Sequence, residues 1–514
     1  MTAFALLCAV GMAAIATADI TGPAPLSWRW SEGSSISPVG DPVAIGNSVF
    51  VATGGRTYCL SRTDGNEVWR FPSQAPLDND NFVDQPVVTE DLVFGRTANQ
   101  KVIAIDRRTG KGVWQYQFQK TITGNFAATQ GNLIVALSDQ TLIALDGETG
   151  AEIWQTPLKV DDGIAGTVTA GPDNKVYFFT GMGDLTCLDV ATQKVVWKKR
   201  FDVVEGGTRP VVVGGRIYAN SGEYVVCLNA VDGSLVWQTP VGETLIVWPG
   251  VSPVAVVAID RKGLAYVLNA RNGHFLLRQP VDTGGPGNAP PASVGTLFAS
   301  ATVDGKLCLF DPFSGKVVWH YLIHPMTSED RNKPVVIGVP AAGAPVSAGN
   351  SLLVLAGDAS LLCFDATTGV DLTPPDIKLV FPNPGEAVSG QPPLTLFFTI
   401  DDESSGLDPD TVEFFVDGHL VPKSVDTGHY DRTKEGYYLL RVTTQGPVLP
   451  LGDGRHVFTV KASDYMGNRG SEDFILIVDN QLAPMVVPGE AAPAPAPVGG
   501  GESPMGPGPG QPGE

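Results

Sequence analysis

The side chains in this sequence that could bind a metal through nitrogen are few and widely spaced. His320 and His324 are four residues apart, a spacing that would place both on one face of a β-strand. A closed zinc site needs four ligands, and no third ligand accompanies this pair in the sequence. We therefore expect two surface histidines rather than a zinc site.

Two acidic stretches carry the oxygen ligands that calcium prefers. They comprise Asp78, Asn79, Asp80 and Asn81 with Asp84, and Asp401, Asp402 and Glu403 with Asp408 and Asp410. Neither stretch has the spacing of an EF-hand loop, and Asp and Asn are also ordinary turn residues. Solvated loops are the preferred interpretation, with calcium binding as the alternative.

The cysteines point to packing rather than to redox chemistry. Beyond Cys8 there are five, an odd number with no two close in sequence, which argues against a disulfide framework. We interpret them as small buried side chains: Cys59, Cys187, Cys227, Cys308 and Cys363. The sequence also has no haem attachment motif, phosphate-binding loop, nucleophile elbow or His-Glu-x-x-His motif. We accordingly assign no catalytic, cofactor-binding or metal-binding residue.

The composition indicates what kind of fold must hold these side chains. The chain has 514 residues, of which 43% are apolar, with 60 glycines and 41 prolines. This combination predicts a globular, all-β protein with many turns. Its 34 basic and 54 acidic residues give a net charge of −20. Such a surface repels phosphate backbones, so we do not expect nucleic-acid binding.

An internal repeat is the main feature of the sequence. Residues 104–114 read A-I-D-R-R-T-G-K-G-V-W, and eight versions of this segment occur, two without the tryptophan. From Trp69 to Trp319, successive tryptophan positions are 40 to 45 residues apart. A period near 40 with short strands is typical of propeller blades. The Asp-x-x-Thr-Gly element predicts a tight turn, in which Asp binds the backbone and Gly supplies a positive φ.

A count of strands predicts how the ring closes. Eight sets of inner strands precede the eight turns, but an outer strand follows only the first seven. The segment Leu26-Ser27-Trp28-Arg29-Trp30 can supply the eighth outer strand and so remove an open edge. In the alternative, Trp28 and Trp30 are simply core residues. We expect an eight-bladed β-propeller closed by the N-terminal strand.

The repeat resembles the tryptophan-docking motif of quinoprotein-type (PQQ-like) propellers, A-x-D-x-x-T-G-K-x-x-W. Residues 104–114 match it at every position, and the resemblance covers residues 24–373. It implies that each indole stacks on the next blade beside the motif glycine, with the motif alanine packed below. Four cysteines occupy that alanine position, and Cys308 lies one position earlier in its own motif.

The remaining segments predict two further parts and a leader. Residues 376–480 are expected to form a β-sandwich of about seven strands, and residues 453–468 resemble bacterial immunoglobulin-like modules. Residues 481–514, rich in Pro and Gly, predict a disordered tail. Residues 1–18 have the apolar stretch and A-x-A end of a cleaved signal peptide, and no later stretch predicts a membrane span.

The enzymatic members of the quinoprotein group are quinone-dependent alcohol and sugar dehydrogenases. Those enzymes carry an adjacent pair of cysteines and a calcium ion, so the resemblance implies the same features in an enzymatic member. This chain has no adjacent cysteines. The chain also resembles, in blade number and repeat type, the propeller scaffold of the outer-membrane barrel-assembly machinery, which lacks a sandwich. We therefore expect a non-catalytic, monomeric scaffold that needs no cofactor.

The expected partners are envelope or extracellular proteins, and the expected location is extracytoplasmic: periplasmic, cell-envelope or secreted. Two alternatives stay open, a quinone- and calcium-dependent dehydrogenase with a divergent site and a propeller that binds glycans or small ligands. Asp84, Arg209 and Trp248 lie near the starts of channel-facing strands. They are the expected rim of the funnel if a small ligand binds there.

Overall fold

The computed structural model describes residues 20–33, 36–201, 209–245, 247–327, 336–383, 385–392, 394–421, 430–432, 438–442 and 450–484. The predicted signal peptide and tail lie outside these residues, apart from residues 481–484. Every regular element described is a β-strand, and no helix in this part of the chain could cross a membrane. The all-β prediction is confirmed.

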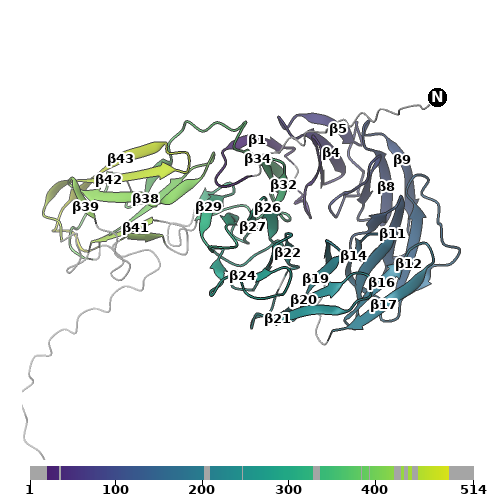
Figure 1. Cartoon of the computed structure of the whole chain (residues 1–514). Helices are drawn as coiled ribbons and strands as arrows, with labels where there is room; N and C mark the ends of the chain where they lie inside the picture. The colour runs from purple at the N-terminus through teal and green to yellow at the C-terminus, as the bar shows by residue number, and fades with distance from the viewer. Residues whose placement is uncertain are drawn as a thin grey trace, which may run out of the picture.

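Eight four-stranded antiparallel sheets form the blades of a propeller, which occupies the right-hand part of Figure 1. Blade one contains β2(Val43–Ile45), β3(Ser48–Thr53), β4(Arg56–Ser61) and β5(Glu67–Phe71). Blades two to four contain β6(Val87–Val88), β7(Leu92–Arg96), β8(Lys101–Asp106), β9(Gly112–Gln117), β10(Ala127–Thr129), β11(Asn132–Leu137), β12(Thr141–Asp146), β13(Leu158–Lys159), β14(Ile164–Ala170), β15(Lys175–Thr180), β16(Asp184–Asp189) and β17(Lys194–Arg200).

Blades five to seven repeat this order with strands of similar length. They contain β18(Val211–Val213), β19(Arg216–Ser221), β20(Tyr224–Asn229), β21(Leu235–Pro240), β22(Gly250–Val251), β23(Ala255–Ile259), β24(Leu264–Asn269), β25(Val281–Asp282), β26(Ala292–Val294), β27(Leu297–Ala301), β28(Lys306–Phe310) and β29(Val317–Leu322). A two-stranded sheet, β30(Met326–Thr327) with β31(Val336–Ile337), follows blade seven. The middle strands of each blade are almost wholly buried, because neighbouring blades cover both faces of the sheet.

The last blade is completed from the beginning of the described chain. Its sheet contains β32(Val346–Ala348), β33(Ser351–Leu355) and β34(Ser360–Asp365), and the outer strand is β1(Leu26–Ser31). β1 runs antiparallel to β34, with Trp28 opposite Cys363. The predicted pairing of the Trp28 segment with the final blade is confirmed.

Docking tryptophans join the blades in the manner that the resemblance implies. At six seams the indole Nε1 donates a hydrogen bond of 2.8–3.1 Å to a carbonyl in the turn of the next blade. A Cβ built on Gly110, which has φ +68°, would lie 2.6 Å from the ring of Trp69. A β-bulge adds Val113 to the outer strand, opposite the step from Ala104 to Ile105. It bends that strand so that the indole of Trp114 reaches the neighbouring blade.

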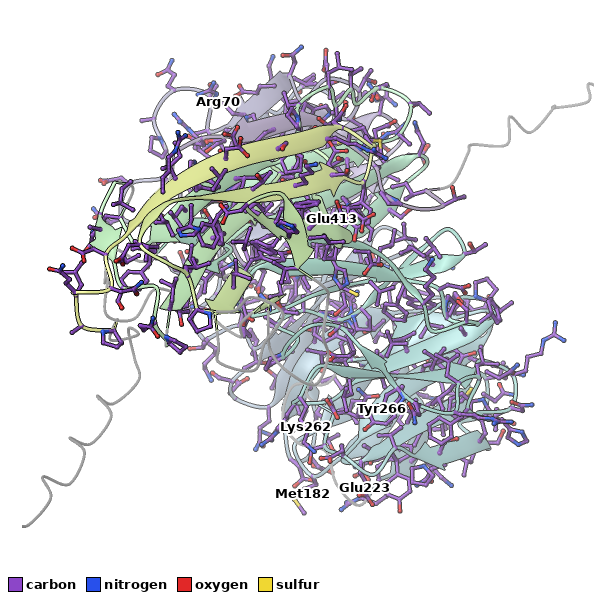
Figure 2. All side chains as sticks on the ribbon, turned by 90° about the vertical axis from the view of Figure 1, so that its left-hand side faces the viewer. Arg70, Met182, Glu223, Lys262, Tyr266 and Glu413 are labelled. Carbon is purple, nitrogen blue, oxygen red and sulfur yellow. The ribbon has the colours of Figure 1, made fainter. Side chains whose placement is uncertain are left out.

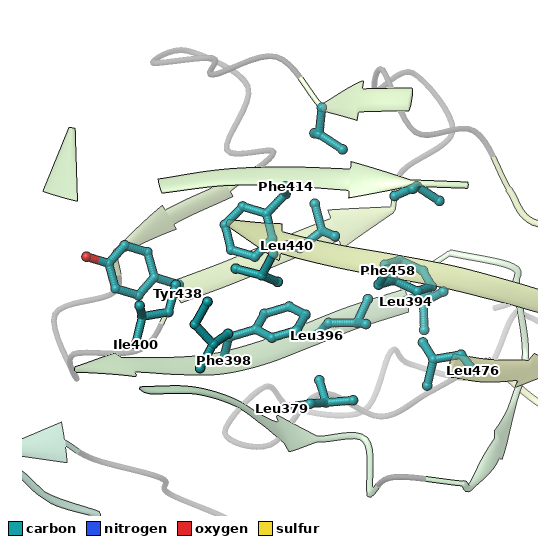
Figure 3. Close-up of a cluster of buried hydrophobic side chains, with 14 of the residues drawn as sticks. Leu379, Leu394, Leu396, Phe398, Ile400, Phe414, Tyr438, Leu440, Phe458 and Leu476 are labelled. Atoms are coloured by element: carbon teal, nitrogen blue, oxygen red, sulfur yellow. The ribbon is translucent and has the colours of Figure 1, made fainter. Parts of the chain in front are cut away.

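Nine strands after residue 375 form two sheets packed face to face, which we call the sandwich (left in Figure 1). One sheet contains β35(Asp376–Phe381), β37(Leu394–Asp401), β40(Tyr430–Arg432) and β41(Tyr438–Val442). The other contains β36(Ala387–Val388), β38(Leu407–Val416), β39(His419–Val421), β42(Gly454–Asp464) and β43(Arg469–Val478). Inward side chains of both sheets, including Phe398, Phe414 and Phe458, share one core (Figure 3). The expected count of about seven strands was low because two-residue and three-residue strands gave no sequence signal.

The sandwich contacts one side of the propeller only. In Figure 2, Glu413 marks the sandwich, and Met182, Glu223 and Lys262 lie at the end of the propeller away from it. The contact includes blade seven and β1, and Val336 of β31 packs against Phe397 of the sandwich. The immunoglobulin-like assignment of the sandwich stays a prediction.

Candidate functional site

Proline residues fix the chain where several inner strands begin beside the axis of the ring. Asp41, Gln85, Arg209, Trp248 and Ala344 each precede a proline. The residue before proline prefers an extended conformation, which suits the entry into a strand. Equivalent entries from different blades therefore bring these side chains to the same level of the propeller.

Hydrogen bonds between these entries connect neighbouring blades. Asp41 N donates to Gln85 Oε1 at 3.2 Å, linking blades one and two. Asn125 Nδ2 donates to Gln85 O at 3.1 Å, linking blades two and three. Ala344 N donates to Asp41 Oδ1 at 2.6 Å, linking blades eight and one across the closing seam. These bonds hold the polar residues of the axial region in fixed positions.

Arg209 and Trp248 lie together, as neighbours on blades five and six. The guanidinium carbon of Arg209 is 6.0 Å from the centroid of the Trp248 ring, within the range of a cation–π interaction. Burial lowers the pKa of Arg209, and the charge of Asp41 opposes that shift. Asp41 belongs to blade one, which is opposite blade five in a ring of eight, so both charges lie close to the axis.

The carboxyl group of Asp41 is the part of this region that the sequence analysis missed. Burial raises its pKa, while the hydrogen bond from Ala344 N and the charge of Arg209 act in the opposite direction. Asp41-Pro42 occupies the same place in its blade as Arg209-Pro210 does in blade five. This shared X-Pro position was the signal that could have identified it. We refer to Asp41, Arg209 and Trp248 as the axial site.

Asp84 does not join the axial site. Its carboxylate is 2.5 Å from Arg96 Nε, and Arg96 Nη1 also donates to Ile122 O at 2.7 Å. Burial raises the pKa of Asp84, and the adjacent Arg96 reduces that shift. The pair therefore ties blade two to blade three. The structure brings two of the three predicted rim residues together and assigns the third to a separate ion pair.

The two histidines do not share a strand face, so that prediction was wrong. β29 ends at Leu322, and His324 lies beyond it, with Nδ1 2.8 Å from Asp358 Oδ2. The chain turns after Leu322, since His324 has φ +44°, and the alternation of a strand no longer applies.

The first acidic stretch does not gather around one point. Asp80 Oδ2 is 3.5 Å from Lys101 Nζ, whereas Asp84 pairs with Arg96.

In the second acidic stretch, Asp402 lies near Asp371 and Asp464, with one oxygen from each within 4.8 Å of the others. Burial and these neighbouring charges raise the pKa of Asp402. Protein donors bind each carboxylate, such as Ser405 Oγ on Asp371 and Asn468 N on Asp464.

The five cysteines are free and buried, as expected. Cys59, Cys187 and Cys227 each lie directly opposite the tryptophan of their own blade. Burial raises the pKa of Cys187 and Cys227 to about 11. Thiols in this environment stay protonated near neutral pH and act as packing groups.

Cys308 lies on the other face of its sheet from the motif position. It pairs with Ser300 and His320, and the tryptophan of that blade pairs with Leu309. Its side chain joins the core between blades six and seven. This accounts for its displacement by one residue from the alanine position.

Comparison with protein families gives a match over the whole propeller. The family described as "Outer membrane protein assembly factor BamB" matches residues 24–163, 138–308 and 182–380. This chain belongs to that family. The BamB match therefore covers well over half of the sequence and ends where the sandwich begins.

Individual BamB proteins are similar over part of the chain. BamB of Burkholderia pseudomallei is 27% identical over 314 residues, which cover 55% of this chain and 76% of that protein. BamB of Yersinia pestis is 24% identical over 263 residues, which cover 51% of this chain and 58% of that protein. The second alignment thus spans little more than half of the relative's length.

Two solved structures support the propeller fold. BamB from Moraxella catarrhalis superposes with a TM-score of 0.53 at 16% identity, covering 67% of this chain and 99% of that one. The computationally designed Ika8 protein superposes with a TM-score of 0.51 at 13% identity, covering 65% of this chain and 98% of that one. At these identities the likeness concerns the fold alone.

Proposed function

We propose that this protein is a non-catalytic, extracytoplasmic scaffold that binds other proteins during assembly of the cell envelope. The observation that carries the proposal is the BamB match across residues 24–380. Proteins named as outer membrane assembly factors share sequence with this propeller at 24–27% identity. The scaffold as proposed uses residues 24–373 as the propeller and 376–480 as a second, immunoglobulin-like domain, and it requires no cofactor.

One groove on the propeller suits an extended segment of a partner protein. It lies between blades two and three and has a volume of about 570 Å³. Leu92, Phe94 and Val113 line it together with the acidic side chains Glu90, Asp91, Asp106 and Glu148. Since both apolar and acidic groups line the groove, the complementary partner segment carries apolar and basic side chains. The groove is our candidate for the partner-binding surface of the scaffold.

The test is photo-crosslinking from the groove in the native envelope. A photoreactive amino acid at Val113, which is 50% exposed, is compared with one at Val236, which is 41% exposed and holds the same motif position in blade five. We expect a protein adduct from position 113 that weakens with added salt, and none from position 236. Equal labelling, or no protein adduct from either position, would contradict the proposed surface. If no crosslinking position on the propeller gives a protein adduct, the proposed scaffold function is contradicted.

The axial site favours a second candidate, the binding of a small ligand that carries a carboxylate. A guanidinium beside an aromatic face can bind such a group through charge and stacking. Thermal-shift screening of glycans and organic acids tests it, with Arg209→Gln as the matched variant. A ligand that stabilises the native chain but not the variant would support this candidate, and a flat response from both would remove it.

The quinone- and calcium-dependent alternative has its own test. Reconstitution with quinone and calcium should produce an absorbance change and dye reduction if a divergent site is present. If neither the absorbance change nor dye reduction is observed, this alternative is excluded.

A further inference from the structure

The seam between blades seven and eight contains a tryptophan but does not use the docking geometry of the six seams described above. Trp319 is fully buried, and its Nε1 donates to Ser405 O in the sandwich at 2.7 Å. The turn of blade eight is covered instead by the chain before β1, because a Cβ built on Gly369 would lie 2.6 Å from Pro25 O. A docking tryptophan of the propeller is therefore attached to the other domain.

The loop that receives Trp319 has the spacing of the repeat turn. Residues 402–406, which we call the junction loop, read D-E-S-S-G, and residues 106–110 of blade two read D-R-R-T-G. Asp402 Oδ1 accepts from Ser404 N and Ser405 N at 3.1 and 2.8 Å. Asp106 Oδ1 accepts from the corresponding amides of its own turn at 3.1 and 2.7 Å. Both loops end in a glycine with positive φ, +87° in one and +68° in the other.

The two loops differ in which carbonyl receives the indole. In the blades the acceptor is one residue after the Asp position, as Arg107 is for Trp69. In the junction loop the acceptor is Ser405, three residues after Asp402. The junction loop thus reproduces the two bonds from backbone amides to the Asp side chain. Its glycine amide differs, since Gly406 N donates to Asp402 Oδ1 whereas Gly110 N donates to the backbone oxygen of Asp106. The loop also presents a different carbonyl to the propeller.

Three consecutive carbonyls of the junction loop accept hydrogen bonds from the propeller. Glu403 O accepts from Tyr321 OH at 2.8 Å, and Ser404 O accepts from Leu26 N at 2.9 Å. Ser405 O accepts from Trp319 as described above. The donors come from β29, the outer strand of blade seven, and from β1, the outer strand of blade eight. One loop of the sandwich therefore joins the outer strands of blades seven and eight.

Gly406 permits this close approach. A Cβ at this position would lie 2.8 Å from the backbone oxygen of His320 on β29, and the residue also has φ +87°. Tyr465 of the sandwich packs against the core shared by blades seven and eight, and its hydroxyl accepts from His320 N at 3.2 Å. The contact is thus close-packed on both sides of the loop.

We propose that the junction loop replaces a repeat turn in the seam between blades seven and eight, so that sandwich and propeller unfold together as one unit. Because the loop also binds β1, the strand that completes the last blade, the sandwich is part of the ring rather than an appended module. This inference is independent of the partner-binding surface proposed above, since the groove lies between blades two and three.

The first test compares two glycine substitutions in the full chain. Gly406→Ala introduces both the φ penalty and the clash with β29, whereas Gly418→Ala introduces the φ penalty alone, since Gly418 has φ +80° and no atom within 4 Å of a built Cβ. Calorimetry of the native chain should show one transition. We expect Gly406→Ala to split it in two and to speed hydrogen exchange at Leu26 N at least tenfold. Gly418→Ala should retain one transition.

A second pair of variants distinguishes a local effect on the junction loop from a general loss of folding. Trp319→Phe removes the indole donor to Ser405, and Trp237→Phe removes the equivalent donor to Ala270 within the propeller. Only Trp319→Phe should speed hydrogen exchange in the junction loop. Two independent transitions in the native chain would overturn the proposal. So would equal effects of the two glycine variants, or equal effects of the two tryptophan variants, on unfolding and hydrogen exchange.

Discussion

Trp28 and Arg62 are joined by a 2.8 Å hydrogen bond from the indole Nε1 to the backbone carbonyl. Trp28 lies on β1, the outer strand of blade eight, and Arg62 lies in the turn of blade one. The bond therefore spans the closing seam of the ring. Arg62 also crosses it, since its Nη1 donates to Ala348 O of blade eight at 2.7 Å.

Removing the donor of Trp28 should weaken this seam specifically. Trp28→Phe keeps an aromatic ring but loses the hydrogen bond, a change worth about 1 kcal/mol of unfolding free energy. We expect faster hydrogen exchange along β1 and β34 in this variant. Trp237→Phe loses the same kind of bond in an internal seam and should leave β1 protected. Equal exchange of β1 in both variants would show that Trp28 has no special role in closure.

Restoring the repeat in blade six should stabilise the propeller. Leu277 occupies the tryptophan position, and a Cβ built on Gly315 would lie 3.2 Å from its side chain, the contact that an indole makes elsewhere. Leu277→Trp should add about 1 kcal/mol, the usual gain from a consensus substitution. The check is a higher denaturant midpoint with an unchanged slope. A lower midpoint would mean that the seam has no room for an indole.

The buried thiols should be unreactive in the folded protein. Burial raises the pKa of Cys308 and Cys363 to about 12, so almost no thiolate is present at pH 8. We expect negligible reaction of the five buried cysteines with a thiol reagent under native conditions and complete reaction in guanidinium chloride. Stability should also be the same with and without a reducing agent. Rapid native labelling of any of the five would contradict the packing role.

The aspartates of the repeat turns should make stability fall in acid. Hydrogen bonds from the side chain and backbone of Thr149 hold the pKa of Asp146 below its ordinary value. A lowered folded-state pKa gives stability that is present above the unfolded pKa, about 3.9, and lost as pH falls through the folded value. Asp146→Asn should therefore reduce the pH dependence below about pH 4. Asn already holds this position in blades five and six. An unchanged acid-unfolding profile would contradict this account.

The propeller was predictable because its signals repeat. The tryptophan positions share one period, and each copy supplies an independent indication of the same turn and strand. The role of β1 followed from counting, since an unmatched inner set required an outer strand from elsewhere. Local chemistry and global arrangement agree throughout this part of the chain.

The junction loop and the axial site were harder to predict from the sequence. Residues 402–406 repeat the turn pattern once, outside the period, and were interpreted as an acidic loop. The partner of Trp319 is 86 residues away in another domain, and no local pattern specifies such a contact. Asp41 was missed because its electrostatic interaction with Arg209 depends on two blades facing each other across the ring. Contacts of this kind arise from closure itself rather than from any one segment.

The pairing of β1 with β34 also sets an order of events during synthesis. Trp28 lies opposite Cys363, 335 positions later in the chain. At ribosomal rates, roughly 20 to 70 seconds separate the emergence of these two residues. Blades one to seven can assemble from local hairpins in that interval, while the first strand has no partner. The first strand of the propeller is thus the last to find its partner, and until then its unpaired backbone can pair with other chains.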